Sequence, residues 1–190
     1  MTETTGTQTK TVIFLTSAEG IEAVELTDPW KAVTDAGHTA KLVSPEGGEV
    51  QLFNHLDKAE TKTADATVAD IDPAQVDALV LPGGVANPDL LRQSDEAVQF
   101  IKKVYEAGTP VAAICHAPWV LAEAGIVSGK RVTGFDSIET DLRNAGAEWV
   151  ADQEVVVDGN LITSRNPDDL PAFNGAIVEA LEHGVAAAQG

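Results

Sequence analysis

Short apolar stretches alternate with helix patterns along most of the chain, and this alternation constrains the fold more than any other feature. Alternation of this kind predicts an α/β fold with a mostly parallel sheet and helices on both faces. The predicted strands cover residues 11–16, 39–44, 77–81, 111–114, 131–134, 154–157 and 161–164, and the predicted helices cover 22–36, 94–107, 117–124, 137–144 and 168–183.

Several local signals set the ends of these elements. Ser94 is an N-cap residue followed by acidic residues, which is typical of a helix start. Pro29 is expected to kink the first helix or to restart it after Asp28. The segment Asp158-Gly159-Asn160 predicts a hairpin between the last two strands, because Asp-Gly tolerates positive φ.

The chain of 190 residues is long enough for one well-buried core. We expect a single domain over residues 11–184, a polar, Thr-rich and disordered tail over 1–10, and a frayed end over 185–190. The first ten residues lack the basic start and apolar run of a signal peptide, and no apolar stretch approaches the ~18 residues of a membrane span. These observations predict a cytoplasmic protein.

The formal net charge is −18, from 30 acidic against 12 basic residues. Nucleic acids and anionic membranes bind clustered Lys and Arg, so this charge argues against both as partners. The sequence contains one cysteine, Cys115, which excludes a disulfide within the chain. Its thiol is therefore either a buried structural group or a reactive one.

Cys115 lies between a predicted strand and a predicted helix, in the segment Ala-Ile-Cys-His-Ala. Small residues two positions on either side allow the sharp turn of a nucleophile elbow, with Ala113 and Ala117 in place of the glycines of esterases. A sulfur at a helix start faces free N–H groups, which stabilise the thiolate. We therefore predict that Cys115 is the nucleophile.

His116 is a candidate general base, or a structural histidine that bonds to the backbone at the helix start. Neighbouring side chains rarely face each other, so we expect poor hydrogen-bond geometry between Cys115 and His116. The remaining histidines show no metal-ligand spacing, and we predict neither a metal nor another cofactor.

Two other loops are predicted at the same edge of the sheet, where ligands of parallel sheets bind. Gly83-Gly84 follows the third strand, and its backbone N–H groups suit an oxyanion hole or simply a turn. Glu22 opens the first helix, where its carboxyl group could hydrogen-bond the sulfur or lie exposed. We expect residues 17–22, 83–89 and 115–119 to meet at this site.

The sequence resembles the PfpI intracellular-protease family of the ThiJ/PfpI superfamily, and most closely its general stress protein branch. The resemblance rests on EGIEAVEL at 19–26, FNHLDKA at 53–59, LVLPGG with NPDLLR at 79–92, and PVAAICHAPWVLAEAG at 110–125. GAEWV and residues 154–173 extend it over nearly the whole chain after Lys10.

The resemblance implies a flavodoxin-like three-layer sandwich that assembles as a homodimer or larger oligomer. It maps the nucleophile onto Cys115, its partner onto His116, the thiol-contacting glutamate onto Glu22, and the oxyanion donors onto the backbone of Gly84 and His116. In the protease members a glutamate from the adjacent subunit completes a triad, and its position falls near Asp89, where the chain has the shorter acid.

Two functions follow as alternatives. The first is a stress-response cysteine hydrolase, a peptidase or a glyoxalase- or deglycase-like enzyme, in which Cys115 attacks a carbonyl of a small adduct or a peptide. The second is a non-enzymatic redox sensor or holdase, in which Cys115 is oxidised to sulfinic acid. An amidotransferase is excluded because the chain lacks the downstream His-x-Glu pair, and a flavodoxin because the loop after the first strand carries two carboxylates.

Overall fold

The computed structural model describes residues 8–186 and 188. Its centre is a sheet of seven strands in the order β11-β12-β8-β7-β1-β3-β6. All neighbouring pairs are parallel except β11 and β12, which form the predicted hairpin. The strands are β1 (Thr11–Leu15), β3 (Thr39–Ser44), β6 (Ala66–Thr67), β7 (Ala78–Leu81), β8 (Val111–Ile114), β11 (Val155–Asp158) and β12 (Leu161–Ser164).

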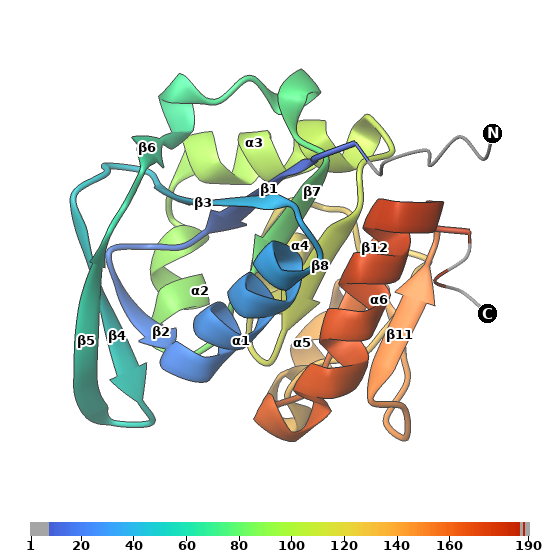
Figure 1. The fold of residues 1–190 in the computed structure, drawn as a ribbon. Helices are drawn as coiled ribbons and strands as arrows, with labels where there is room; N and C mark the ends of the chain where they lie inside the picture. The colour runs from blue at the N-terminus through green and yellow to red at the C-terminus, as the bar shows by residue number, and fades with distance from the viewer. Residues whose placement is uncertain (1–7, 187, 189–190) are drawn as a thin grey trace, which may run out of the picture.

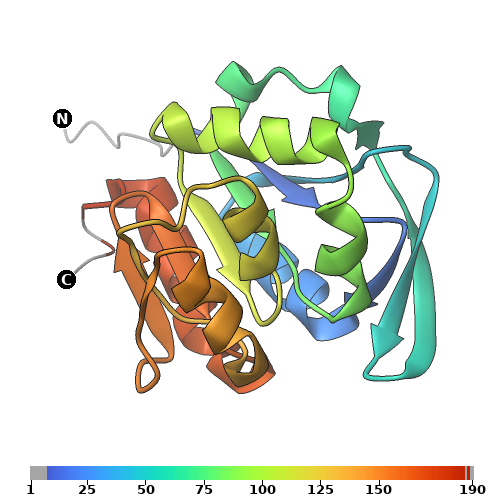
Figure 2. The same ribbon diagram turned by 180° about the vertical axis from the view of Figure 1, so that it is seen from behind.

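Helices cover both faces of this sheet, as the alternating pattern predicts (Figures 1 and 2). On one face, Val12 and Phe14 of β1 share a core with α1 (Ala23–Asp35) and α6 (Leu170–His183). On the other face, Ile13 and Leu15 share a core with α3 (Asp95–Glu106), α4 (Pro118–Glu123) and α5 (Glu139–Asn144). Successive residues of a strand point to opposite faces, so β1 is apolar from Val12 to Leu15 because both of its faces are buried there.

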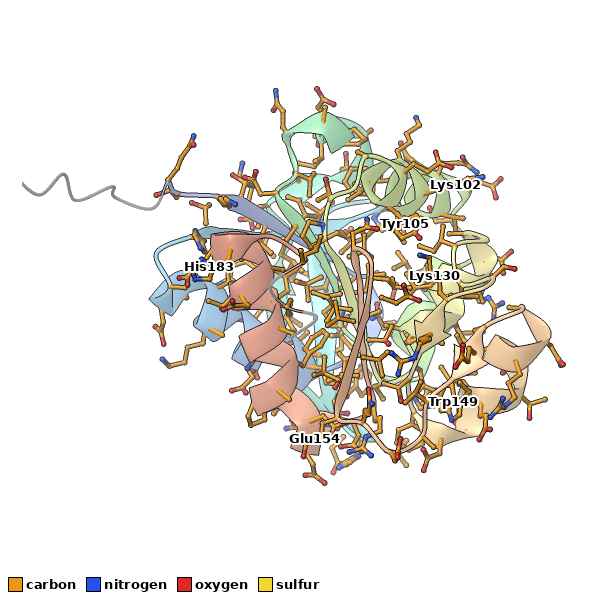
Figure 3. All side chains as sticks on the ribbon, turned by 90° about the vertical axis from the view of Figure 1, so that its right-hand side faces the viewer. Lys102, Tyr105, Lys130, Trp149, Glu154 and His183 are labelled. Carbon is orange, nitrogen blue, oxygen red and sulfur yellow. The ribbon has the colours of Figure 1, made fainter. Side chains whose placement is uncertain are left out.

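The three layers are visible edge-on in Figure 3, where His183 of α6 and Lys102 of α3 lie on opposite sides of the sheet. This arrangement confirms the predicted α/β sandwich with a mostly parallel sheet. Ser94 caps α3 as predicted, accepting a hydrogen bond from the Ala97 N–H at 3.2 Å. Pro29 lies inside α1 and does not end it.

A second, three-stranded sheet lies beside the first and was not predicted from the sequence. It contains β2 (Glu19–Glu22), β4 (Glu49–Asn54) and β5 (Asp57–Thr63), in the order β2-β4-β5. Most residues of β5 are exposed, so its sequence lacks the apolar alternation of a half-buried strand. Figure 1 shows β4 and β5 projecting as a long hairpin at the left of the molecule.

The remaining short elements connect these layers. α2 (Ala86–Leu91) follows β7, and β9 (Arg131–Val132) pairs with β10 (Glu148–Trp149). Residues 131–134 were predicted as one longer strand, of which only the first two form β9. The pairing ends at Val132 because Thr133 and Gly134 lead into the loop that reaches Cys115.

The ends of the chain are described only in part. Of the predicted N-terminal tail, residues 1–7 lie outside the described residues, as do 187 and 189–190 at the other end. Lys10 does not behave as a tail residue, because its N–H donates to His38 Nδ1 and its Nζ donates to the Leu181 carbonyl. Among the described residues, no helix has both the length and the apolar character needed to cross a membrane.

Candidate active site

Cys115 occupies the sharp turn between β8 and α4. Its φ is 64°, one of two positive values among the non-glycine residues that the structure describes. Such a backbone conformation is costly for a residue with a Cβ and is often found at functional sites. The turn is held by hydrogen bonds from the Cys115 N–H to the Ser164 carbonyl (3.1 Å) and from the Ala117 N–H to the Ile114 carbonyl (3.0 Å). The predicted nucleophile elbow is therefore present.

The thiol faces the imidazole of the next residue, contrary to the expectation from the sequence. Sγ of Cys115 lies 3.1 Å from Nδ1 of His116. The expectation assumed an ordinary strand or helix, in which adjacent side chains diverge. The positive φ of Cys115 breaks that regularity and brings the two side chains together.

Contacts on three sides hold the imidazole ring of His116 in place. Its Nε2 atom lies 3.2 Å from Oγ of Ser137. Its plane stacks on the Phe135 ring, with 4.6 Å between the ring centroids. The Trp119 ring packs against it edge to face, with 5.2 Å between the ring centroids. Burial lowers the pKa of His116, so the neutral ring, which can accept a proton, predominates at neutral pH.

The carboxyl group beside the sulfur belongs to Glu25, whereas the sequence analysis placed it at Glu22. Glu25 is on the first turn of α1, is fully buried and interacts with the Cys115 thiol and the amides of Gly83 and Gly84. Glu22 precedes α1, and its carboxylate accepts a hydrogen bond from the His55 N–H at 3.1 Å. The difference follows from the geometry of the helix start. The side chain of Glu22 is directed to the β4–β5 hairpin, and that of Glu25, almost one turn later, is directed into the core.

Burial dominates the electrostatics of this carboxyl group. It raises the pKa of Glu25 to about 8, while the thiol and the two glycine amides act in the opposite direction. Neither carboxyl oxygen has a hydrogen-bond partner of good geometry among the described residues. The group is therefore mostly protonated at neutral pH and can act as a hydrogen-bond donor toward the sulfur.

The pKa of Cys115 is raised, not lowered as the position at a helix start suggests. Burial is the main cause, and a charged Glu25 adds to it. The N–H groups of Gly84 and His116 act in the opposite direction. These are the two predicted oxyanion donors, and both N–H groups face the sulfur of Cys115. Burial therefore outweighs the stabilisation of the thiolate that was expected at the helix start.

The glycines after β7 are required by close packing. A Cβ on Gly83 would overlap Oε2 of Glu25 and would lie 2.6 Å from Cβ of Cys115. Gly84 has a φ of 81°, and a Cβ there would overlap the carbonyl oxygen of Gly20. The Gly-Gly pair therefore allows the loop after β7 to approach both α1 and the elbow.

Cys115 and His116, which we call the dyad, line a pocket of about 880 Å³. Residues from the three predicted loops meet in it, together with the tip of the β4–β5 hairpin. Asp89, the predicted inter-subunit acid, is exposed on α2 and lines the pocket of its own chain. The wall is mainly apolar and includes Phe53, Leu56, Val85, Trp119, Phe135 and Pro167.

Sequence reasoning missed Glu25, Phe135 and Ser137. Glu25 precedes Pro29 by four residues, which places it next to the apolar stripe of α1, so a buried acid could have been suspected from helical spacing. Phe135 and Ser137 lie in an irregular segment whose path depends on the tertiary fold. Among the described residues, no group of three or more His, Cys, Asp or Glu side chains is arranged to hold a metal ion.

Comparison with known proteins agrees with this fold. The DJ-1/PfpI family model matches residues 10–180. The protein named Deglycase TK1284 from Thermococcus kodakarensis is 41% identical over 169 residues, which cover 89% of this chain and 98% of that protein. General stress protein 18 of Bacillus subtilis is 42% identical over 161 residues, covering 85% of this chain and 92% of that protein.

A solved structure of a similar protein has the same fold. The crystal structure of Drosophila melanogaster DJ-1beta superposes with a TM-score of 0.83 at 30% sequence identity, covering 96% of this chain and 95% of that one. The chain belongs to the DJ-1/PfpI family.

Proposed function

We propose that this protein is a cysteine-dependent hydrolase that removes small carbonyl adducts, an activity of the deglycase kind. The observation that carries the proposal is the Cys115–His116 contact, with Sγ and Nδ1 3.1 Å apart at the base of a large pocket. A thiol beside a neutral imidazole has the pairing that nucleophilic catalysis needs. The name of the relative from Thermococcus kodakarensis supports the same chemistry.

The proposed reaction begins with attack of Sγ on the carbinol carbon of the adduct, which bears the amine or thiol and lies next to the carbonyl, as His116 takes the thiol proton. The N–H groups of Gly84 and His116 stabilise the oxyanion that forms. His116 then returns the proton to the leaving amine or thiol, which leaves a hemithioacetal on Cys115. A hydrogen shift between its carbinol carbon and its carbonyl carbon, through an enediolate, gives the thioester that water hydrolyses. The apolar wall of the pocket favours an uncharged adduct over a strongly anionic one.

The test uses purified protein and N-acetylarginine modified with methylglyoxal, freed from excess methylglyoxal and kept in phosphate buffer. Release of free N-acetylarginine is followed by mass spectrometry, and a fluorogenic tripeptide is assayed in parallel for peptidase activity. We expect release by the wild type and a loss of at least about 10³-fold in Cys115→Ser and Cys115→Ala. Full activity in Cys115→Ser would contradict the proposal, and cleavage of the tripeptide alone would reassign the enzyme as a peptidase.

A second candidate, a redox sensor, is favoured by Glu25. A protonated carboxyl group beside the sulfur can donate a hydrogen bond to a sulfinate, and the raised pKa of Glu25 keeps that proton at neutral pH. Each step consumes one peroxide: the thiolate becomes a sulfenate with release of water, and the sulfenate then becomes a sulfinate.

Intact mass after mild peroxide treatment separates this candidate from the first. A sensor gains two oxygen atoms on Cys115 and stops there, while Glu25→Gln overoxidises further because the ionisable donor is lost. A wild-type protein that gains no oxygen would exclude the sensor function without affecting the hydrolase proposal.

We also propose a homodimer. Val85, just before α2, and Leu90, near its end, are large apolar residues that are 57% and 39% exposed, and they lie on either side of Asp89 in the chain. A second subunit covering this surface would remove apolar area from water. Light scattering coupled to size-exclusion chromatography measures the assembly directly, and a monomer at micromolar concentration would contradict the proposal.

A further inference from the structure

The segment after β9 contacts the dyad at three points. The Phe135 N–H donates a hydrogen bond to the Cys115 carbonyl at 2.8 Å. The Phe135 ring stacks on His116, and Oγ of Ser137 lies 3.2 Å from its Nε2. One short stretch of chain therefore fixes the backbone of the nucleophile, the plane of the imidazole and the nitrogen that faces away from the sulfur.

The two ring nitrogens of His116 have different partners, and these determine the tautomer. Nδ1 must accept the thiol proton, so in the neutral ring it must be unprotonated. The proton then lies on Nε2, where Oγ of Ser137 is the acceptor within reach. We propose that Ser137 is a positioning residue that holds His116 in the tautomer able to accept the Cys115 proton, and this inference rests on the proposed function.

The proton count is simple. The Sγ–H bond of Cys115 breaks, its electron pair stays on sulfur, and the proton forms a new bond to Nδ1 of His116. The resulting imidazolium keeps its Nε2–H, which donates to Ser137 throughout. The hydrogen bond from Nε2 becomes stronger as the ring gains charge, so Ser137 stabilises the ion pair more than the neutral pair.

Ser137 differs from the carboxylate that completes many such arrangements. A hydroxyl group carries no charge, so it raises the pKa of the ring less than a carboxylate would, and burial still lowers the pKa of His116. Asp89 lines the same pocket, but the partner that the structure places at Nε2 is Ser137. The ionisable groups around the ring are Cys115, Glu25, Glu22, His55 and Asp89 in or against the pocket, and Asp136 next to Ser137 in the chain.

The test compares Ser137→Ala, Ser137→Thr and Ser137→Asp with Thr140→Ala. Thr140→Ala is a matched control that removes an exposed hydroxyl three residues away. Ser137 is itself exposed, so none of these changes opens a cavity in the core. Two measurements need no substrate: the pH profile of Cys115 alkylation by iodoacetamide, and the ¹⁵N chemical shifts of the His116 ring.

We expect Ser137→Ala to slow alkylation near neutral pH by about 10-fold, the size of one hydrogen bond to a charged group, and to mix the two tautomers in the ¹⁵N spectrum. Ser137→Thr keeps the hydroxyl and should restore the wild-type spectrum and a rate within about 3-fold. Ser137→Asp should raise the pKa of His116 and move the pH profile of alkylation by about one unit or more.

Wild-type tautomer and alkylation profile in Ser137→Ala would overturn the proposal. The proposal would also be overturned if Asp89→Asn mixed the two tautomers of His116 and Ser137→Ala did not. That result would assign the positioning of the ring to Asp89. Because both measurements are independent of substrate, they decide the role of Ser137 even if the adduct hydrolase assay fails. If that assay succeeds, Ser137→Ala should lower kcat with little change in KM, since the residue acts through His116.

Discussion

The buried carboxyl group of Glu25 lies against the thiol of Cys115, and the two residues are 0% and 6% exposed. They come from different halves of the molecule: Glu25 from α1, and Cys115 from the elbow after β8. Each raises the pKa of the other when it is charged. The pair therefore holds at most one negative charge over most of the pH range, and three of its consequences can be measured.

The first prediction concerns stability. The pKa of Glu25 is about 8 in the folded protein, against an ordinary value of 4.5 for a glutamate in water. Below pH 4.5 both states are protonated and the fold keeps its full stability. As pH rises toward 8, the unfolded state loses the proton first, so the free energy of unfolding falls by up to about 1.4 kcal/mol per unit. Urea denaturation of wild type and Glu25→Gln between pH 5 and pH 8 should show this slope in the wild type only, and parallel curves would contradict it.

The second prediction concerns the reactivity of Cys115. Burial raises its pKa, so iodoacetamide should alkylate it more slowly at pH 7 than it alkylates free cysteine. Above pH about 8, Glu25 is charged and suppresses the thiolate, so Glu25→Gln should increase the rate there by several-fold. Between pH 5 and 6.5, where Glu25 is protonated, the two proteins should react alike. Glu22→Gln is the control, and an equal increase in that variant would show a general charge effect.

The third prediction concerns the glycine between the two groups. Gly83→Ala places a methyl group on both Glu25 and Cys115, which should destabilise the protein by about 2 kcal/mol or more and abolish the activity. Gly175→Ala is the control, because its Cβ meets nothing within 4 Å. It should stabilise α6 by up to about 1 kcal/mol. Thermal unfolding measures the stability of both variants. A wild-type melting temperature in Gly83→Ala would show that the loop is not packed tightly against Glu25 and Cys115.

The fourth prediction concerns an ion pair behind the site. Arg165 donates to the buried carboxylate of Asp169 from Nε at 2.8 Å and from Nη2 at 2.9 Å. Asp169→Asn leaves the guanidinium without its bidentate partner and should cost about 2 kcal/mol of stability. The exposed pair of Lys31 and Asp35 provides the comparison, with Asp35→Asn expected to cost less than about 0.5 kcal/mol. Equal effects in chemical denaturation would contradict this difference.

Much of the architecture followed from local patterns. The strands at 39–44, 111–114 and 161–164 have the predicted bounds. The last two are fully buried, and the first is buried over its second half, so each leaves an apolar signal. β2, β4 and β5 left no such signal. Their pairing depends on contact between segments up to 32 residues apart, from Glu19 to Gln51, and their apolar face, with Ile21, Val50 and Leu52, is too short to give a strong local pattern.

The sequence by itself determined the class of fold and the place of the nucleophile, because Cys115 is bonded into the turn between one strand and the next helix. Only the tertiary structure decided which groups surround the sulfur. Glu25, Gly84 and Ser137 reach the site from three other segments, and their convergence depends on the packing of α1, the loop after β7 and the loop after β9. Side-chain neighbours of that kind are separated by up to 112 residues, from Glu25 to Ser137, so no local pattern encodes them.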